Sequence, residues 1–479
     1  METLSLKETL KLLESSDKLM RIGGELAPSI EIPWLSIQLS RETDKALLYD
    51  RVKGGALSLA TNLFYGKLPL VLNAPSVERI IERAARVLHL LSTPAAQPTD
   101  KLGLLASLAW IADYYPTVKE APGGAVRILQ GYDVNLLEMP FLKHSREEEY
   151  PVLVNPIIVA SSRATGDREI ASQRVQVVDE KTMVLHVPRG SPLQFLIEKS
   201  SRSRSSLDVG ILAGTVPALY PASLLTWLTP VDKILLAGVL SESKISVVKT
   251  EEGLVIPYPT EVAIIGELEP GDERPEGRML YENGEVYGGS PMPVVHVKKI
   301  LLSPSPVFYS SIIHPERSDV AQVYSLVASL LVLLMKSLAP EIQELRFLGH
   351  DAFRTVIAKV ATHRRERLLS IGGEILFLSA AVNPYVDTVI LVGPDVDVED
   401  PTILAKVLLE NVDPDRDIIH VDQADAELLP RSSRRGKVIV LANAPGARGA
   451  SRVESKLEKT PESERLFLEL TRKLRGSSS

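Results

Sequence analysis

The chain contains no cysteine among its 479 residues. This absence excludes disulfide bonds, a thiolate nucleophile and every zinc site that uses cysteine sulfur. A secreted fold held together by disulfides is excluded with them. Any metal ion must therefore be bound by oxygen or imidazole ligands.

The sequence also lacks a long apolar segment. Its longest apolar run, Val323 to Met335, is shorter than the roughly 20 residues that span a bilayer, and Lys336 ends it. We expect a buried helix there and no membrane span. Residues 1–21 carry Glu, Lys and Asp throughout, which predicts a charged amphipathic helix rather than a signal peptide. A cytoplasmic location is therefore the expectation.

No strong excess of charge is present. The net charge is -7, from 54 basic and 61 acidic residues, so no overall field favours nucleic acid or an anionic membrane. Short basic clusters occur, but they lack interleaved aromatic residues. This composition favours solvated surfaces over a nucleic-acid site.

Several catalytic signatures are missing as well. There is no Walker A sequence, no complete G-x-G-x-x-G after a strand, no H-E-x-x-H and no G-x-S-x-G. Phosphoryl transfer and triad hydrolysis therefore lose support. The 8 histidines never fall at metal-ligand spacing from one another, which argues against a His-rich metal centre.

The hydrophobic content of 45% is enough for the cores of several domains. In residues 4–91, apolar residues recur at three- and four-residue spacing, which predicts a helix-rich region. Between residues 125 and 309 the period drops to two, and prolines and glycines separate the strand-like runs, which favours a barrel or meander. The expected strands are Val175–Val178, Val209–Leu212, Ile245–Val248, Val262–Ile265 and Val294–Leu301.

From Asp319 onward helix and strand alternate, which is typical of a compact α/β domain. The polar end of the chain carries one further helical pattern. The expected elements are helices at 319–338, 401–411 and about 462–474, and strands at 345–348, 388–392, 417–421 and 438–441.

One stretch of the central region has residue types suited to binding a phosphate. Residues 173–178 read Gln-Arg-Val-Gln-Val-Val, and residues 186–190 read His-Val-Pro-Arg-Gly. An arginine fork on a rigid strand and a glycine turn with accessible N–H groups both suit the phosphate of a flavin. An Arg-Gly turn alone is usually only a turn, but further motifs follow it in order: Val209–Gly214, Leu235–Gly238, Val247–Lys249, Leu254–Pro257, Thr260–Val262, Pro293–Val297, Val307–Tyr309, Asp395–Val398 and Pro414–Asp417.

Together these motifs resemble the UbiD family of decarboxylases over about residues 70 to 425. The resemblance implies an α/β (α+β multidomain) fold with an N-terminal α/β domain (1–120), a central flavin-reductase-like split β-barrel (121–318), a C-terminal α/β oligomerisation domain (319–450) and a helix and tail (451–479). It implies prenylated FMN as the electron sink, with Mn²⁺ and often K⁺ at its phosphate. The cofactor-binding residues would be Ser172, Gln173, Arg174, His186, Val187, Pro188, Arg189 and Gly190.

The resemblance also assigns metal ligands. Glu261 stands where the family has its metal-ligating glutamate, and a carboxylate suits Mn²⁺. Glu169 stands five residues before Arg174, where the family usually carries a metal-ligating asparagine, and it is either a ligand or a solvated loop residue. The third ligand of many members, a histidine, has no counterpart, because Ser191 and Pro192 occupy that region.

The family's catalytic residues are an arginine that holds one carboxylate ionised and a second carboxylic acid that delivers a proton. Arg174 and Glu276 fall at the first two places. The expected acid then arrives one residue late, at Glu282. Glu282 is the proton donor if the extra residue is accommodated; otherwise Tyr281 takes its place.

The expected function is the reversible, non-oxidative decarboxylation of an aromatic or α,β-unsaturated acid, of 4-hydroxybenzoate or anhydromevalonate-phosphate type. Arg278 would either recognise a phosphate on the substrate or be an exposed structural residue. The expected partners are a flavin prenyltransferase that supplies the cofactor and further copies of the chain, as a dimer or hexamer. The alternative is a non-catalytic paralogue that serves as a cofactor-binding or partner subunit.

Overall fold

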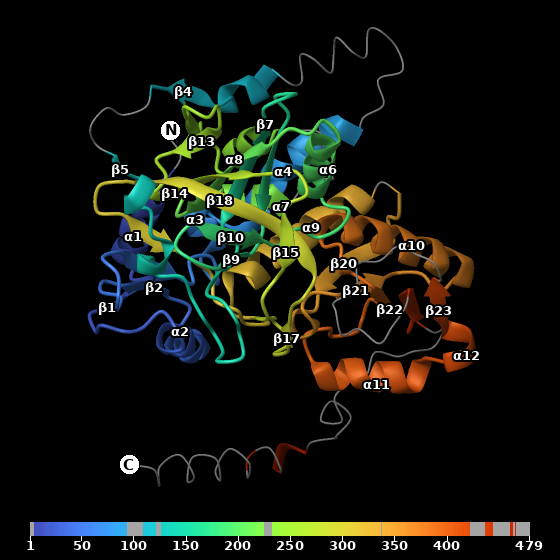
Figure 1. The fold of residues 1–479 in the computed structure, drawn as a ribbon. Coiled ribbons are helices and arrows are strands. Elements are labelled where there is room, and N and C mark those ends of the chain that lie inside the picture. Colours follow the sequence, from blue (N-terminus) through green and yellow to red (C-terminus); the bar gives the residue numbers. More distant parts are fainter. Residues whose placement is uncertain are drawn as a thin grey trace.

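The computed structural model describes residues 4–92, 109–120, 126–224, 232–336, 338–421, 436–443, 460–462 and 465. Their helices and strands form three regions that pack against one another. Figure 1 shows the blue N-terminal elements beside the green and yellow central strands, with the orange C-terminal elements to one side. The mixed α/β architecture predicted from the sequence is confirmed.

The N-terminal region starts with a helix that its own side chains cap. Ser5 and Glu8 each accept a hydrogen bond from the other's backbone N–H, which starts α1 at Leu6. The helix predicted for residues 1–21 was too long: α1 ends at Ser15, and β1 pairs with β2 in parallel. The elements are α1 (Leu6–Ser15), β1 (Leu19–Ile22), α2 (Glu31–Glu42), β2 (Ala46–Tyr49), β3 (Ser58–Thr61), α3 (Leu68–Val71) and α4 (Val77–Ser92).

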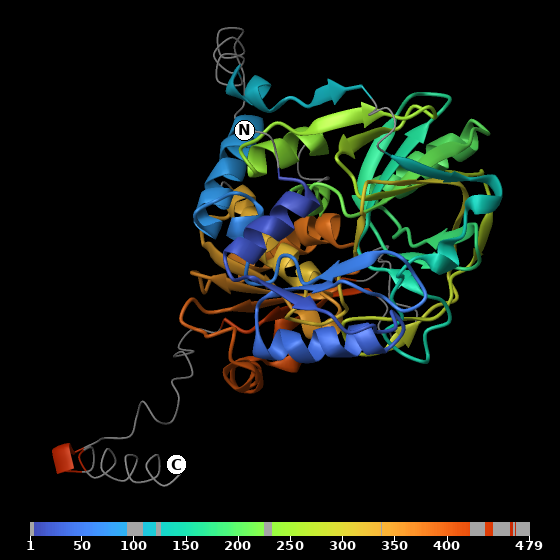
Figure 2. The same cartoon turned by 90° about the vertical axis from the view of Figure 1, so that its left-hand side faces the viewer.

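The central region is built around one curled antiparallel sheet, which Figure 2 shows as a half-barrel of green and yellow strands. The strand order is β6-β9-β10-β18-β14-β11-β7-β8, and β5 and β15 also pair with β18. The strands are β5 (Arg127–Gln130), β6 (Val152–Leu153), β7 (Ile157–Ser162), β8 (Arg168–Ser172), β9 (Val175–Val177), β10 (Thr182–Leu185), β11 (Leu207–Ala213), β14 (Val262–Leu268), β15 (Glu273–Pro275) and β18 (Pro291–Leu302).

Smaller elements surround this sheet. The last of them, β19, leaves the central region and completes the N-terminal sheet in the order β1-β2-β3-β19. All five strands predicted in the central region are present. The surrounding elements are β4 (Thr117–Lys119), α6 (Pro192–Arg202), α7 (Leu219–Leu224), α8 (Lys233–Leu240), β12 (Ser246–Lys249), β13 (Val255–Tyr258), β16 (Met279–Leu280), β17 (Val286–Tyr287) and β19 (Val307–Tyr309), with short 3-10 helices at Ala109–Tyr114, Gly131–Asp133 and Leu136–Glu138.

The C-terminal region is a five-stranded sheet in the order β20-β21-β22-β24-β23, covered by helices. The predicted helix and strand at 401–411 and 388–392 are confirmed as α11 and β22. The helix predicted at about 462–474 lies almost entirely outside the described residues. The elements are α9 (Asp319–Met335), β20 (Ile342–Phe347), a 3-10 turn (Gly349–Asp351), β21 (Thr355–Val360), α10 (Arg365–Val382), β22 (Thr388–Val392), α11 (Pro401–Asn411), α12 (Pro414–Asp417), β23 (Ile418–Val421) and β24 (Lys437–Leu441).

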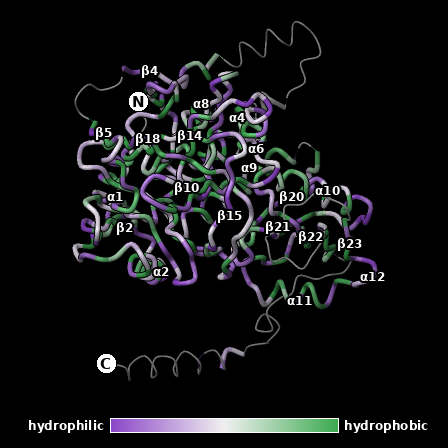
Figure 3. The backbone as a smooth tube through the Cα atoms, viewed as in Figure 1, coloured by the Kyte–Doolittle hydropathy of each residue, from purple (hydrophilic) through white to green (hydrophobic). Residues whose placement is uncertain are grey.

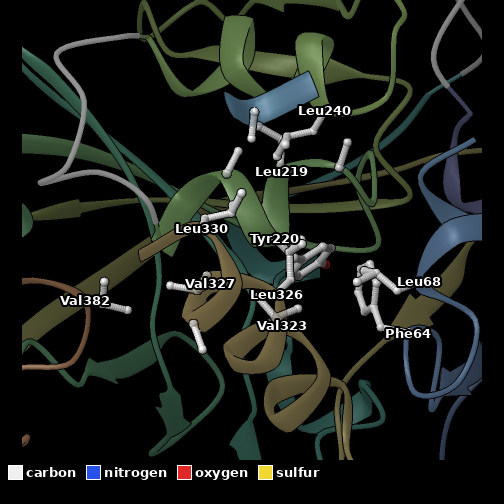
Figure 4. Close-up of a cluster of buried hydrophobic side chains, with 14 of the residues drawn as sticks. Phe64, Leu68, Leu219, Tyr220, Leu240, Val323, Leu326, Val327, Leu330 and Val382 are labelled. Atoms are coloured by element: carbon white, nitrogen blue, oxygen red, sulfur yellow. The ribbon is translucent and has the colours of Figure 1, made fainter. Parts of the chain in front are cut away.

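One buried cluster joins the three regions around α9. Figure 4 shows side chains of α9, such as Leu326, beside Tyr220 of α7, whose ring also contacts that of Phe64 in the N-terminal region. At the start of α9, the fully buried Asp319 accepts hydrogen bonds from the backbone N–H of Phe64 and from the Tyr309 hydroxyl. A buried carboxylate needs such donors, and here they come from segments far apart in the sequence.

The predicted helix in the longest apolar run is confirmed as part of α9, and it is largely buried. Figure 3 shows hydrophobic and hydrophilic residues alternating along all three regions. No helix in the described parts of the chain is both long enough and apolar enough to cross a bilayer.

Candidate active site

A cleft lies where the curled sheet meets the C-terminal region. Its empty space is about 910 Å³, part of it open to solvent, which is the size of a small-molecule or cofactor site. Residues 172–174 and 281–282 line one side. Residues of α9 and residues 352–353 and 382–385 line the other side.

Arg174 lies on the sheet side of the cleft, in the short connection between β8 and β9. Its Nη2 donates to Glu282 Oε1 at 2.6 Å, and its Nη1 donates to the Leu280 carbonyl at 3.2 Å. The guanidinium carbon is 4.5 Å from the centre of the Tyr281 ring. Burial is the largest single influence and opposes the charge, but Glu282, Tyr281 and Tyr385 together outweigh it and raise the pKa of Arg174. The cleft therefore contains a permanent cation.

Tyr281 and Glu282 follow β16 in the hairpin that β16 forms with β17. The Gly277 N–H donates to the side-chain oxygen of Gln176, and the Gln176 side-chain amide donates to the Gly277 carbonyl, both at 2.8 Å. These bonds fix the chain entering the hairpin. Both Tyr281 and Glu282 then line the cleft, and the carboxylate that pairs with Arg174 is that of Glu282.

Glu276, which the resemblance places with Arg174, belongs to a second polar group. Its Oε2 is 2.9 Å from Nδ1 of His186, and Nε2 of His186 is 2.8 Å from the Tyr385 hydroxyl. Because a carboxylate can only accept, Nδ1 of His186 carries the hydrogen that is donated to Glu276, and Nε2 of a neutral ring would accept from Tyr385. This chain of hydrogen bonds connects the central sheet to the C-terminal region across the cleft.

The predicted cofactor-binding residues divide into two sets. Ser172, Gln173, Arg174, His186 and Pro188 line the cleft.

Val187, Arg189 and Gly190 are not part of that lining. The Val187 side chain is buried, and the Gly190 N–H donates to Gln194 Oε1 at the start of α6. Without a ligand the Gly190 N–H is therefore bonded to a side chain, and the binding of a phosphate by this glycine turn stays a prediction.

The two predicted metal ligands each pair with a lysine. Glu169, which is partly exposed, forms an ion pair with the buried Lys233. Glu261 lies 3.0 Å from Lys7 Nζ and accepts a hydrogen bond from the Ser303 hydroxyl at 2.6 Å. Both carboxylates already have protein partners.

The register of the sheet also separates these two carboxylates. Across the sheet, Glu169 of β8 pairs with Ala160 of β7, Ala160 pairs with Val209 of β11, and Val209 pairs with Gly266 of β14. Glu169 and Gly266 therefore lie at the same level along the strands. Glu261 precedes Gly266 by five residues, which is about 17 Å along the strand. Within the described ranges, no three His, Asp or Glu side chains gather as a metal site would require. The residues present do not fit the metal centre that the resemblance implies.

Sequence reasoning missed the opposite wall of the cleft. Tyr324 of α9 and Phe353 stack with ring centres 4.4 Å apart, and both line the cleft. Tyr220 of α7 also lines it, and its hydroxyl is buried near the backbone of Gly214 and Thr215. Burial raises the pKa of Tyr220. These residues lie in helical or apolar segments, where their spacing is the same as that of ordinary core residues.

Three family models match the chain in sequence order. They are described as the N-terminal, Rift-related and C-terminal domains of a 3-octaprenyl-4-hydroxybenzoate carboxy-lyase. They match residues 10–87, 117–316 and 321–442, respectively. Most of the chain is therefore covered.

Similar proteins match over nearly the full length. An uncharacterized protein of Archaeoglobus fulgidus is 21% identical over 433 residues, covering 89% of this chain and 88% of the relative. An evolved dimeric form of the UbiD-class enzyme HmfF from Pelotomaculum thermopropionicum, in complex with prFMN, has a TM-score of 0.70 at 21% identity, covering 95% of this chain and 98% of that one. The closed form of vanillic acid decarboxylase from Sedimentibacter hydroxybenzoicus has a TM-score of 0.74 at 18% identity, covering 98% of each chain.

Proposed function

The chain belongs to the UbiD family of carboxy-lyases, and on this basis we propose that it removes CO₂ from an aromatic or α,β-unsaturated acid in the cleft beside Arg174. The observation that carries the proposal is the ion pair between Arg174 and Glu282, which is buried and faces the cleft. A fixed cation can bind a carboxylate substrate, and an adjacent carboxyl group can exchange a proton with the product.

The cleft lining fits a flavin. One wall offers polar side chains at Ser172, Gln173 and Arg174, and the other offers the aromatic pair of Tyr324 and Phe353. We propose that these residues hold prenylated FMN, as the solved relative HmfF does. When bound, this group accepts the electrons that the departing CO₂ leaves behind.

Arg174 then serves two carboxylates in turn. Before substrate binds, Glu282 accepts a short hydrogen bond from Arg174. A substrate carboxylate that approaches Arg174 competes with Glu282 for the same guanidinium. Glu282 can then take a proton from the solvent that reaches the cleft and deliver it to the carbon that has lost CO₂.

The hydrogen bonds between Glu276, His186 and Tyr385 hold the two walls of the cleft together. The vanillic acid decarboxylase of Sedimentibacter hydroxybenzoicus is known in a closed and an open form. We propose that Tyr385 leaves His186 when the cleft opens and returns when it closes around the substrate. Closure would exclude water from the reacting groups.

The substrate class favoured for the first test is an aromatic acid without a phosphate. Arg278, which the sequence suggested as a phosphate-binding residue, is exposed and is not part of the cleft lining. We further propose a flavin prenyltransferase as the source of the cofactor, a homo-oligomer (dimer or hexamer), a cytoplasmic location and the domain division given above.

The proposal is tested by loading the protein with its cofactor. The chain is co-expressed with a flavin prenyltransferase and purified without oxygen, and the bound flavin is identified by its absorbance and mass. The loaded protein is then incubated with 4-hydroxybenzoate-type acids and with anhydromevalonate phosphate in buffered D₂O. We expect loss of CO₂ and deuterium incorporation at the carbon that carried the carboxylate.

Two variants test whether activity depends on Arg174 specifically or is lost through a general disturbance of the fold. Arg174→Met should abolish deuterium incorporation while the folded protein remains, and Glu273→Gln, an exposed glutamate on β15, should behave as the unaltered chain. A folded protein that takes up no prenylated FMN would refute the enzyme and support the non-catalytic paralogue. A loaded protein inactive on every acid would refute the proposed substrate class.

A further inference from the structure

The ion pair of Glu169 and Lys233 is built into the edge of the central sheet. Glu169 lies on β8, the last strand on the path of the sheet, and Lys233 is the first residue of α8. The Lys233 ammonium donates to the Glu169 carboxylate and to the carbonyl of Ile170. Only 7% of the Lys233 side chain is exposed. A buried ammonium is retained only where it has such partners.

The protein itself fixes the position of this lysine. The Asp232 side chain accepts from the N–H groups of Ile234 and Leu235 and so caps α8. Arg168, next to Glu169, lies 3.1 Å from Asp232. Two adjacent ion pairs therefore hold the first turn of α8 against β8. In one, β8 supplies the cation and the α8 cap the anion; in the other, β8 supplies the anion and α8 the cation. The Lys233 ammonium keeps its place without a ligand.

The electrostatics of the pair agree with this geometry. Burial raises the pKa of Glu169 and lowers the pKa of Lys233, and the attraction between the two groups opposes both shifts. The pair as a whole is neutral. A divalent ion bound to Glu169 would need the position that the Lys233 ammonium occupies. Beside the ammonium, such an ion would be repelled by its positive charge.

The pair also lies close to the cleft. Ser172, three residues further along β8, lines the cleft, and so does Leu224 at the end of α7. Three residues of strand correspond to about 10 Å, a distance that the ribityl chain of a flavin can bridge. An ammonium has three donors, and the described residues supply acceptors for two of them. The third donor can serve a phosphate oxygen.

We propose that the Lys233 ammonium replaces a divalent metal ion in this chain, and that the flavin phosphate is bound by protein cations without Mn²⁺. This inference rests on the proposed flavin site. The second predicted metal ligand supports it, because Glu261 lies far along the sheet with its own lysine. The seven residues before Asp232, which lie outside the described structure, contain no His, Asp or Glu in the sequence.

The test measures FMN binding by the purified full-length chain, using the quenching of flavin fluorescence. Titrations are run with EDTA and, separately, with added Mn²⁺, and free Mn²⁺ is followed by its electron paramagnetic resonance signal. We expect the same dissociation constant in both conditions and no Mn²⁺ bound with FMN. A tenfold or greater tightening by Mn²⁺, or one bound Mn²⁺ per chain, would overturn the inference.

The role of the lysine is tested by removing both charges together. Lys233→Met with Glu169→Gln keeps the side-chain volumes and leaves no unpaired buried charge, so the fold should persist. Loss of one charge-assisted hydrogen bond should weaken FMN binding about 10- to 100-fold. Lys199→Met, an exposed lysine on α6, is the matched control and should change nothing.

The outcomes distinguish the inference from the function on which it rests. A folded double variant that binds FMN as tightly as the unaltered chain would overturn the role of Lys233 while the flavin site stands. If the unaltered chain binds neither FMN nor prenylated FMN, with or without Mn²⁺, the proposed function fails and the inference fails with it.

Discussion

Replacing Glu282 by glutamine removes the acid but little else. Glutamine keeps the length of the side chain and an oxygen that can accept from Arg174, which now donates to Glu282 at 2.6 Å. It cannot carry an ionisable proton. Loss of a positioned general acid typically lowers kcat by about 10²- to 10⁴-fold. We therefore expect Glu282→Gln to lower the rate of product protonation at least a hundredfold.

The same change should also cost stability. Removing one partner of a buried ion pair costs about 3–5 kcal/mol when nothing replaces it. Here the glutamine oxygen, the Leu280 carbonyl and the Tyr281 ring still contact Arg174. We therefore expect a decrease of about 2–3 kcal/mol in the free energy of unfolding, since part of the interaction remains.

The assay pairs Glu282→Gln with Tyr281→Phe. The phenylalanine ring keeps its place under Arg174 and loses only the hydroxyl, so it tests the other acid that the sequence allowed. Deuterium incorporation into product is measured on protein loaded with prenylated FMN, and stability is measured by urea unfolding. The reasoning is refuted if Glu282→Gln keeps more than a tenth of the rate, or if Tyr281→Phe alone abolishes it.

Three further outcomes are expected. Tyr385→Phe, which removes the hydrogen bond to His186, should raise KM several-fold with a smaller change in kcat; an unchanged KM would contradict a role in closing the cleft. Asp319→Asn should lower the free energy of unfolding by about 3 kcal/mol in urea, because one of its two oxygens, each of which accepts hydrogen bonds, becomes a donor. The Arg416 guanidinium lowers the pKa of Asp417 to about 2, so stability from this group is present above about pH 4 and is lost as pH falls toward 2. Asp417→Asn should remove that part of the acid limb in thermal unfolding, and an unchanged limb would contradict it.

The sequence predicted most of the local structure. Period-two alternation located the central strands, and the alternation of helix and strand after residue 319 located the C-terminal elements. The reason is that local burial imposes a period of two or 3.6 on each element. At the N-terminus this signal failed, because a four-residue strand such as β1 is too short to show a period that excludes a helix.

The sequence also identified Arg174 and Glu282 as candidates, from motifs in which neighbouring residues along the chain share a site. It left Glu282 and Tyr281 as alternatives for the acid. In the folded chain both side chains line the cleft, and the carboxylate that pairs with Arg174 is that of Glu282.

By itself, then, the sequence determined the family, the type of most elements and the sheet side of the cleft. Only the tertiary structure decided that Glu276 turns to His186, that Tyr324, Phe353 and Tyr385 form the opposite wall, and that Lys233 holds Glu169. Each of these contacts joins segments from different elements of the fold. Buried polar groups need hydrogen-bond partners, and buried rings need rings or side chains to pack against. Which residue becomes the partner depends on how the three regions pack together, and the local sequence does not contain that information.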